Sequence, residues 1–164
     1  MRKCIKTTIQ EFLNEQVIHE SFTNENVTIG DIYPESDIYS YIQKLHRNEE
    51  DFYEGDIGER IERFSTYVVA DIPIDKIEMD EYQLDDDYVD DYVKMFEKLG
   101  TYPPIVLGQY NKNWGYNIID GTHRANALRK LGFTSIIAFV GLNKYPTTLR
   151  KAKNLKTYYN HEIY

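Results

Sequence analysis

Five consecutive residues, Asp120-Gly-Thr-His-Arg124, bring together a carboxylate, a hydroxyl, an imidazole and a guanidinium. The residues before them, 116–119, end in two isoleucines and predict a short buried strand, and Asp-Gly is a common turn. Residues 122–131 then predict a helix that stops at Gly132. The first N–H groups of a helix have no partner within it and bind anions well. The sequence therefore predicts a phosphate-binding site formed by Gly121, Thr122, His123 and Arg124, with Asp120 at its edge.

Two roles are open for the acid of this turn. Asp120 could cap the helix through its carboxylate, or it could take part in catalysis by holding Mg²⁺ or orienting a nucleophile. We expect Arg124 to open the helix without filling the core, so that its loss weakens phosphate binding more than folding. A structural salt bridge from Arg124 to an acid among residues 85–91 is the alternative.

Hydrophobic spacing indicates the segments that must position this turn. Residues 66–71 are β-branched and apolar and predict a strand. Residues 87–100 and 36–47 predict helices, the first with acids in its opening turn. A further amphipathic helix is expected over residues 8–20. Residues 21–31 are loop-like, and residues 49–64 give no assignment.

The motif and its place in the chain resemble the ParB/sulfiredoxin superfamily. Asp-Gly-x-His-Arg between an apolar strand and an Ala/Leu-rich helix is similar to the superfamily's signature. Residues 72–77 resemble its opening strand, 80–83 its first loop, and 102–107 its next turn and strand. The resemblance implies a mixed α/β domain over residues 71–141. Residues 1–70 are then expected to form a helical N-terminal extension, and residues 142–164 a basic C-terminal helix or tail.

Three branches of the superfamily differ at this motif. Sulfiredoxins carry a reactive cysteine where this chain has Thr122, so sulfiredoxin activity is not expected. Chromosome-partition ParB proteins carry Gly-Glu-Arg-Arg on a CTP triphosphate, and this chain keeps the final arginine but replaces the glutamate. They also carry a DNA-binding helix-turn-helix after this domain, for which the segment after Val140 is short. Free serine kinases carry Asp-Gly-His-His-Arg, the closest match, which implies that ATP or CTP binds at the turn, with or without Mg²⁺.

The resemblance to the kinases also implies a catalytic acid in the loop after the first strand of the domain. Glu81 lies at the corresponding place, and Glu78, Asp80 and Asp85 compete with it. A solvated loop acid is the structural alternative for Glu81. The resemblance thus implies Asp120, Glu81 and His123 as catalytic candidates.

Two further features have simpler explanations than a ligand site. The acidic run Asp85-Asp86-Asp87 and Asp90-Asp91 complements the start of the expected helix over residues 87–100, and adjacent acids on a helix point in different directions. No dedicated metal site is therefore expected. His46 lies at the polar end of the expected helix 36–47, where we expect a solvated surface residue rather than a ligand.

Composition and charge limit the classes of function. The 164 residues are 41% hydrophobic and 28% charged, which is ordinary for a soluble domain, and the single cysteine, Cys4, cannot form an internal disulfide. With no apolar run near ~18 residues and no signal peptide at the start, we expect a cytoplasmic protein. The net charge of −8 disfavours general DNA binding, although residues from Gly121 onward hold eight bases and one acid.

The leading hypothesis is a nucleotide-binding protein that catalyses phosphoryl transfer or nucleotide hydrolysis at the Asp120–Arg124 turn. A ParB-like nuclease or DNA-acting accessory protein is the alternative, and it would use the basic residues Arg150, Lys151, Lys153 and Lys156. A second alternative is a binding module that keeps the fold without the chemistry. The sequence leaves open the acceptor, any protein partner and the oligomeric state.

Overall fold

The structure is a computed structural model that describes residues 23–46, 54–79, 84–109 and 115–142. The helix expected over residues 8–20, the candidate acid Glu81 and the basic segment 144–156 lie outside these residues. In chain order the elements are β1 (Ile32–Pro34), α2 (Glu35–His46), α3 (Glu54–Ile61), β2 (Thr66–Pro73), a 3-10 helix (Ile74–Lys76), β3 (Ile77–Glu78), α4 (Asp86–Leu99), β4 (Ile105–Gln109), β5 (Tyr116–Asp120), α5 (Thr122–Lys130) and β6 (Ser135–Leu142).

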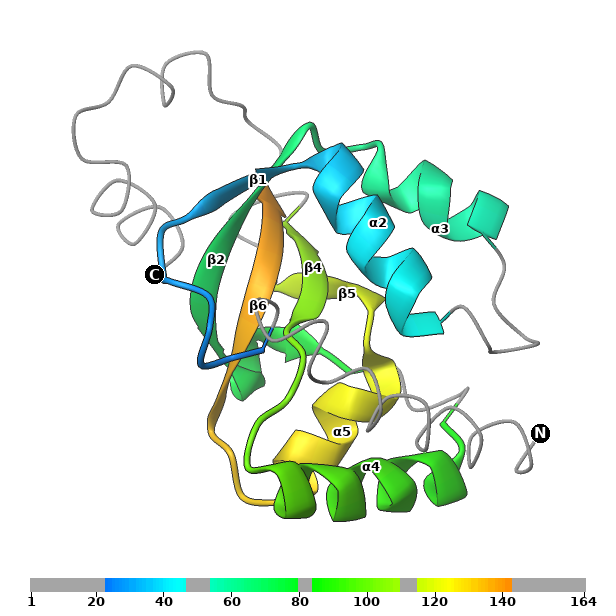
Figure 1. Cartoon of the computed structure of the whole chain (residues 1–164), viewed down its shortest axis with the longest axis vertical. Coiled ribbons are helices and arrows are strands. Elements are labelled where there is room, and N and C mark those ends of the chain that lie inside the picture. Colours follow the sequence, from blue (N-terminus) through cyan, green and yellow to red (C-terminus); the bar gives the residue numbers. More distant parts are fainter. Residues whose placement is uncertain (1–22, 47–53, 80–83, 110–114, 143–164) are drawn as a thin grey trace.

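The strands form one mixed sheet of six strands in the order β1-β2-β6-β4-β5-β3 (Figure 1). The pairs β1–β2, β2–β6 and β4–β5 are antiparallel, whereas β4–β6 and β3–β5 are parallel. The chain is therefore a mixed α/β protein, as the sequence predicts. The strand expected over residues 66–71 is β2, which adds to the sheet between β1 and β6.

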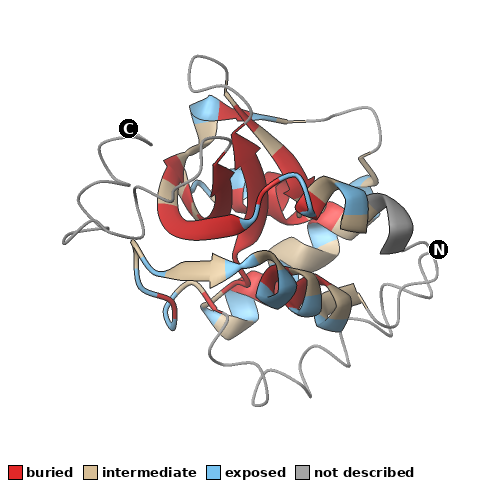
Figure 2. Cartoon of the chain, turned by 90° about the horizontal axis from the view of Figure 1, so that it is seen from above, coloured by how far each residue is buried: buried red, intermediate tan, exposed pale blue. Residues whose placement is uncertain are grey.

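Helices cover both faces of the sheet. Neighbouring side chains along a strand point to opposite faces, so a strand such as β2 contributes side chains to two cores. In β2, Val68, Ala70 and Ile72 pack in the core with α4 and α5, whereas Tyr67 and Val69 pack in the core with α2 and α3. Figure 2 shows the strands largely buried, whereas the helices carry exposed residues on their outer sides. The turn after β5 leads from the central layer into α5. Residues of this turn and of the start of α5 contact side chains or backbone from both helical layers.

The helix ends follow the local signals in the sequence. Asp85 caps α4 by accepting a hydrogen bond from the Asp87 N–H at 2.9 Å, and Gly100 ends the helix with a positive φ of 72°. α5 ends just before Gly132, whose φ of 93° also favours glycine. Helix α3 lies within the segment 49–64 for which the sequence gives no assignment. Its Ile61 packs with Phe64 on the α2/α3 side of the sheet.

A β-bulge lies immediately before the candidate site. Along the β4–β5 pair, Leu107 lies opposite Ile118 but Val106 lies opposite Asp120, so β5 contains one extra residue. A bulge bends the strand and changes the direction of the side chain that follows it. In this chain the side chain that follows is the carboxylate of Asp120.

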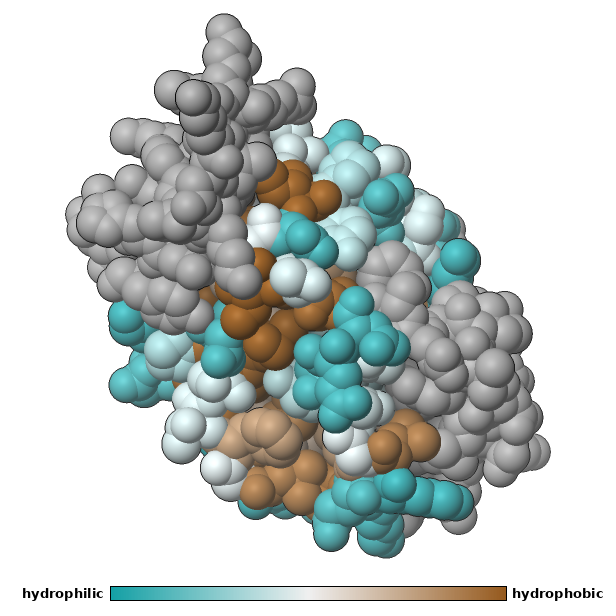
Figure 3. Space-filling view, turned by 60° about the vertical axis from the view of Figure 1, so that its left-hand side comes forward, coloured by the Kyte–Doolittle hydropathy of each residue, from teal (hydrophilic) through white to brown (hydrophobic). Residues whose placement is uncertain are grey.

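In the described part of the chain, the α-helices have between 8 and 14 residues. No helix there is long and apolar enough to cross a membrane. On the face drawn in Figure 3, apolar side chains gather in the middle and hydrophilic ones lie around them. Apolar atoms commonly provide more than half of a protein surface, so this band needs no separate functional explanation. The division of the chain at residues 70 and 141 stays a prediction, although β2 runs across the first of these positions.

Candidate functional site

The carboxylate of Asp120 is bound by basic side chains from two different helices. His46, the last residue of α2, lies with Nε2 at 2.9 Å from Asp120 Oδ1 and 3.0 Å from Oδ2. Arg124, in the first turn of α5, donates from Nη2 to Oδ2 at 2.9 Å. The Asp120 and His46 side chains are only 9% and 13% exposed. The expectation that His46 is a solvated surface residue is therefore wrong.

These cations keep Asp120 ionised. Burial alone would raise the pKa of the Asp120 carboxyl, but the charges of His46, Arg124 and Arg60 and the hydrogen bond from His46 outweigh it and lower the pKa to about 2. A carboxylate with so low a pKa is a weak proton acceptor at neutral pH. Its geometry suits it to hold Arg124 and His46 in place.

Arg124 is a buried residue. Its side chain is 3% exposed, so the expectation that it opens the helix without filling the core is wrong. Its salt-bridge partner is Asp120, not an acid among residues 85–91. Two of its guanidinium nitrogens, Nε and Nη1, are buried with no hydrogen-bond partner among the described residues. Buried donors without acceptors are rare in native proteins and cost about 1–3 kcal/mol each, so they call for an explanation.

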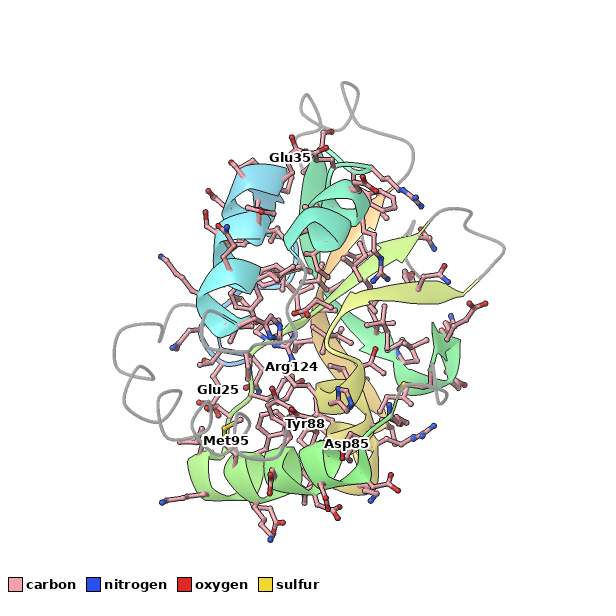
Figure 4. All side chains as sticks on the ribbon, turned by 90° about the vertical axis from the view of Figure 1, so that its right-hand side faces the viewer. Glu25, Glu35, Asp85, Tyr88, Met95 and Arg124 are labelled. Carbon is pink, nitrogen blue, oxygen red and sulfur yellow. The ribbon has the colours of Figure 1, made fainter. Side chains whose placement is uncertain are left out.

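Residues from both helical layers surround the Arg124 guanidinium. The hydroxyl oxygen of Tyr41 in α2 favours the charged form of Arg124 through its partial charge and through a side-chain hydrogen bond. The Tyr41 hydroxyl itself donates to the Pro104 carbonyl at 2.6 Å. Tyr92 of α4 also favours the charged form of Arg124. Figure 4 shows Arg124 in the centre of the molecule between α2 and α4. Although burial alone lowers the pKa of Arg124, Asp120 and the two tyrosines raise it above its usual value.

A second arginine fixes the strand that carries Asp120. Arg60 of α3 donates from Nη2 to the Ile118 carbonyl, two residues before Asp120.

The burial of Tyr41 raises its pKa well above the usual value, so its hydroxyl stays protonated at any physiological pH. Helices α2 and α3 thus contribute His46, Tyr41 and Arg60 to the surroundings of the turn.

Gly121 occupies the N-cap position of α5, with φ 111° and no side-chain cap. The interpretation of Asp120 as the cap of this helix is therefore wrong, because its carboxylate is taken by His46 and Arg124. A Cβ on Gly121 would lie 2.7 Å from Ile105 Cγ2 and 2.8 Å from Arg124 Nη2. Only glycine fits here, both for its backbone conformation and for the space that Arg124 occupies. Gly121 consequently offers no side chain to the free N–H groups at the start of α5.

The other candidate residues of the turn face α4. The Asp85 backbone N–H donates to His123 Nε2 at 3.1 Å, so the proton of the neutral ring is on Nδ1. The ring of Tyr88 lies 5.4 Å from the His123 ring, tilted by 51°. Asp85 and Tyr88 both belong to the α4 side of Figure 4. The Thr122 carbonyl accepts from the Asn126 side chain at 2.8 Å within α5.

The acids near Glu81 have other partners. Glu78 accepts from the Asn117 side chain at 2.9 Å, and Asp85 caps α4. These contacts hold neither the Glu78 carboxylate nor the Asp85 carboxylate at Asp120. Within the described ranges, no group of three or more histidine, cysteine, aspartate or glutamate side chains could hold a metal ion.

Sequence reasoning missed His46, Tyr41 and Arg60 as parts of this site. His46 and Arg60 are 74 and 58 residues from their partners in the chain, so no spacing connects them to the turn. The available signal was chemical: a histidine and an arginine near the ends of helices that carry apolar faces. The helical spacing of 38, 41 and 42 correctly predicts burial of Tyr41, but gives its hydroxyl no role.

Comparison with known proteins places the turn in a family context. The profile of the ParB N-terminal domain family matches residues 58–155, which include β2 to β6 and leave α2 outside. No curated protein sequence matches the chain.

Several solved structures are similar in part. A free serine kinase variant in complex with AMP is 25% identical over 45% of this chain and 30% of the kinase chain, with a TM-score of 0.39. Sulfiredoxin from Arabidopsis thaliana is 21% identical over 59% of this chain and 98% of its own, with a TM-score of 0.38. A conserved hypothetical protein from Pyrococcus furiosus is 28% identical over 45% of this chain and 31% of its own, with a TM-score of 0.39. The matched part thus spans about a third of the kinase chain.

Proposed function

The chain belongs to the ParB N-terminal domain family, and we propose that the start of α5 in this domain binds the phosphates of a nucleotide. The observation that carries the proposal is Arg124, whose Nε and Nη1 are buried donors with no partner in the described structure. Arg124 lies in the first turn of α5, and the N-cap residue of this helix, Gly121, offers no side-chain acceptor. A phosphate oxygen entering this turn would supply the missing acceptors.

The charge balance at the turn also supports an anion. Asp120 contributes one negative charge, and Arg124, Arg60 and a charged His46 contribute positive ones. The positive end of the α5 dipole adds to them. In a site shielded from water these charges act more strongly on a phosphate than they would on the surface. The donors in the proposal are the first N–H groups of α5, the Thr122 hydroxyl and the Arg124 guanidinium.

A nucleotide is proposed over other anions because the motif Asp-Gly-x-His-Arg resembles that of the free serine kinases. ATP and CTP are the two candidates, with Mg²⁺ carried by the phosphates. The proposal extends to phosphoryl transfer or hydrolysis of the nucleotide. His123 would then donate from Nδ1, because its Nε2 already accepts from Asp85. Asp120 would position Arg124, which leaves the orientation of the nucleophile to Glu81.

The first test is a thermal-shift screen of the full chain against ATP, CTP, ADP and AMP, each with and without Mg²⁺. A ligand of the folded state raises the melting temperature by linkage. We expect a triphosphate to raise it, and calorimetry then gives the affinity. Arg124→Lys keeps a positive charge beside Asp120 but removes the planar fork of donors, and should weaken binding by roughly 10- to 100-fold.

Arg129→Lys is the matched control, because Arg129 is an exposed arginine of the same helix that donates to Asn126 at 2.6 Å. It should leave the affinity unchanged. Equal affinities in the two variants would remove Arg124 from the site. Binding without turnover of ATP or CTP would reduce the proposal to a binding module, and salt-sensitive DNA binding without nucleotide binding would replace it with the DNA-acting alternative.

A further inference from the structure

His46 belongs to a part of the chain that the family match does not cover. The ParB N-terminal domain profile begins at residue 58, whereas α2 ends at His46. Yet His46 contacts both oxygens of Asp120, and Asp120 Oδ2 is shared between His46 and Arg124. A helix outside the matched domain therefore carries one of the three basic side chains that act on the Asp120 carboxylate.

We propose that His46 is a positioning residue of the phosphate site, which tunes the affinity for anions by competing with Arg124 for Asp120. The inference rests on the proposed function. When the imidazole carries a charge, it balances the carboxylate and leaves the charge of Arg124 for the phosphate. When the imidazole is neutral, Asp120 balances Arg124 instead, and the attraction for phosphate falls. Histidine is the side chain whose charge changes between about pH 5 and 8.

Within the described part of the chain, charged and titratable groups from several packed elements surround Asp120 and Arg124. Tyr41 comes from α2 itself, Arg60 from α3, Asp120 from the end of β5, and Arg124 from α5, while Tyr92 of α4 acts on Arg124. The arginines stay charged and the tyrosine Tyr41 stays neutral throughout the physiological range. Because Asp120 stays ionised down to about pH 2, the histidine is the one residue of this group whose type changes charge between about pH 5 and 8.

The experiment compares the affinity for ADP of the full chain with that of His46→Gln, by calorimetry from about pH 5.5 to 8.5, across the titration range of histidine. Glutamine keeps a donor for Asp120 and removes the charge. The phosphates of ADP and the other histidines are the same for both proteins, so the ratio of the two affinities isolates His46. We expect a ratio of roughly ten at low pH, the effect of a nearby unit charge, that falls toward one at high pH.

Lys44→Gln is the matched control. It removes one positive charge from the same last turn of α2, but Lys44 is exposed. It should bind ADP as the unmodified chain does at each pH. His46→Lys should restore tight binding without the decline toward high pH, which a purely structural role of His46 would not produce. The unfolding free energy of each variant is measured by denaturant to keep folding and binding separate.

A reciprocal measurement needs no variant. If charged His46 favours ADP tenfold, then linkage requires saturating ADP to move the His46 titration midpoint upward by about one pH unit. The ring resonances of His46 report that midpoint by NMR. An unmoved midpoint, or an affinity ratio that stays at one at every pH, overturns the role of His46 while the phosphate site stands. Failure of the unmodified chain to bind ADP, ATP or CTP overturns both proposals.

Discussion

The two sides of the α5 start hold their polar groups in different ways. On the α2 side, Asp120, Arg124 and His46 form a charged network with side chains between 3% and 13% exposed. On the α4 side, His123 accepts a hydrogen bond from the Asp85 backbone N–H and lies against the half-buried ring of Tyr88. The first side combines full charges with burial, and the second combines a neutral ring with partial exposure.

This difference suits the two sides of the motif to two different roles. A buried charged network is costly to disturb, because removal of one member leaves another charge buried and unpaired. Such a network is suited to fix the direction of Arg124. A neutral, partly exposed histidine can accept or donate a proton without disturbing the fold. We therefore expect changes on the α2 side to affect stability far more than changes on the α4 side.

The largest expected effect is that of Asp120→Asn. The variant leaves the buried Arg124 without its counter-charge, which should lower the unfolding free energy by about 3–5 kcal/mol. Denaturant unfolding measures the loss. Asp90→Asn is the control, because Asp90 lies 3.1 Å from Lys130 with both side chains more than half exposed, and should cost under about 1 kcal/mol. Equal losses in the two variants would contradict a buried network on the α2 side.

Gly121→Ala comes next, because it introduces both a strained backbone and a clash with Ile105 and Arg124. Gly132→Ala separates the two causes. Its φ of 93° is also positive, but its added Cβ would meet nothing within 4 Å. We expect Gly132→Ala to cost about 1–2 kcal/mol through the backbone alone, and Gly121→Ala roughly 1–3 kcal/mol more. If the two variants lose the same unfolding free energy, the close approach of Arg124 to Gly121 is wrong.

The acid limb of the stability curve gives the next effect. The folded-state pKa of Asp120 is lowered from 3.8 to about 2, so its contribution is present above pH 3.8 and is lost as the pH falls toward 2. A shift of this size corresponds to on the order of 2 kcal/mol. Unfolding free energies measured at several pH values should show this loss in the unmodified chain. In Asp120→Asn this part of the pH dependence should be absent, and its persistence there would assign it to other carboxyls.

The smallest effect on stability is expected for His123→Ala. The variant loses one hydrogen bond to Asp85 and one ring contact with Tyr88, together about 0.5–1.5 kcal/mol. If His123 donates to a phosphate, turnover or affinity should fall by a larger factor than stability does. A loss of stability comparable to that of Asp120→Asn would remove the contrast between the two sides.

How far the sequence predicts this site depends on how local its contacts are. Strand β5, the turn at Gly121 and helix α5 lie in one stretch of fewer than twenty residues, and their apolar spacing and turn residues predict them. The same local signals predict α4 and the acids at its start, among which the structure shows Asp85 as the cap. Asp120 and Arg124 are four residues apart in this stretch. Residues with this spacing come close together where a helix begins.

The burial of the turn could not be predicted, because it depends on helices from a distant part of the chain. His46 reaches Asp120 only because α2 packs on the opposite face of the sheet from α4 and α5. Without that contact, the motif suggests an exposed Arg124 and a capping Asp120. The β-bulge before Asp120 is equally hidden, since Asn117-Ile-Ile has no turn residue that marks it.

The central claim is that phosphates of a nucleotide bind at the start of α5 and engage the unpartnered donors of Arg124. The most direct test follows the Arg124 Nε–H resonance of isotope-labelled full-length chain during titration with ATP or CTP and Mg²⁺. We predict that this resonance shifts and saturates at the same nucleotide concentration as the calorimetric signal, while the Arg129 Nε–H resonance stays in place. Nucleotide binding that leaves the Arg124 resonance unmoved would contradict the claim.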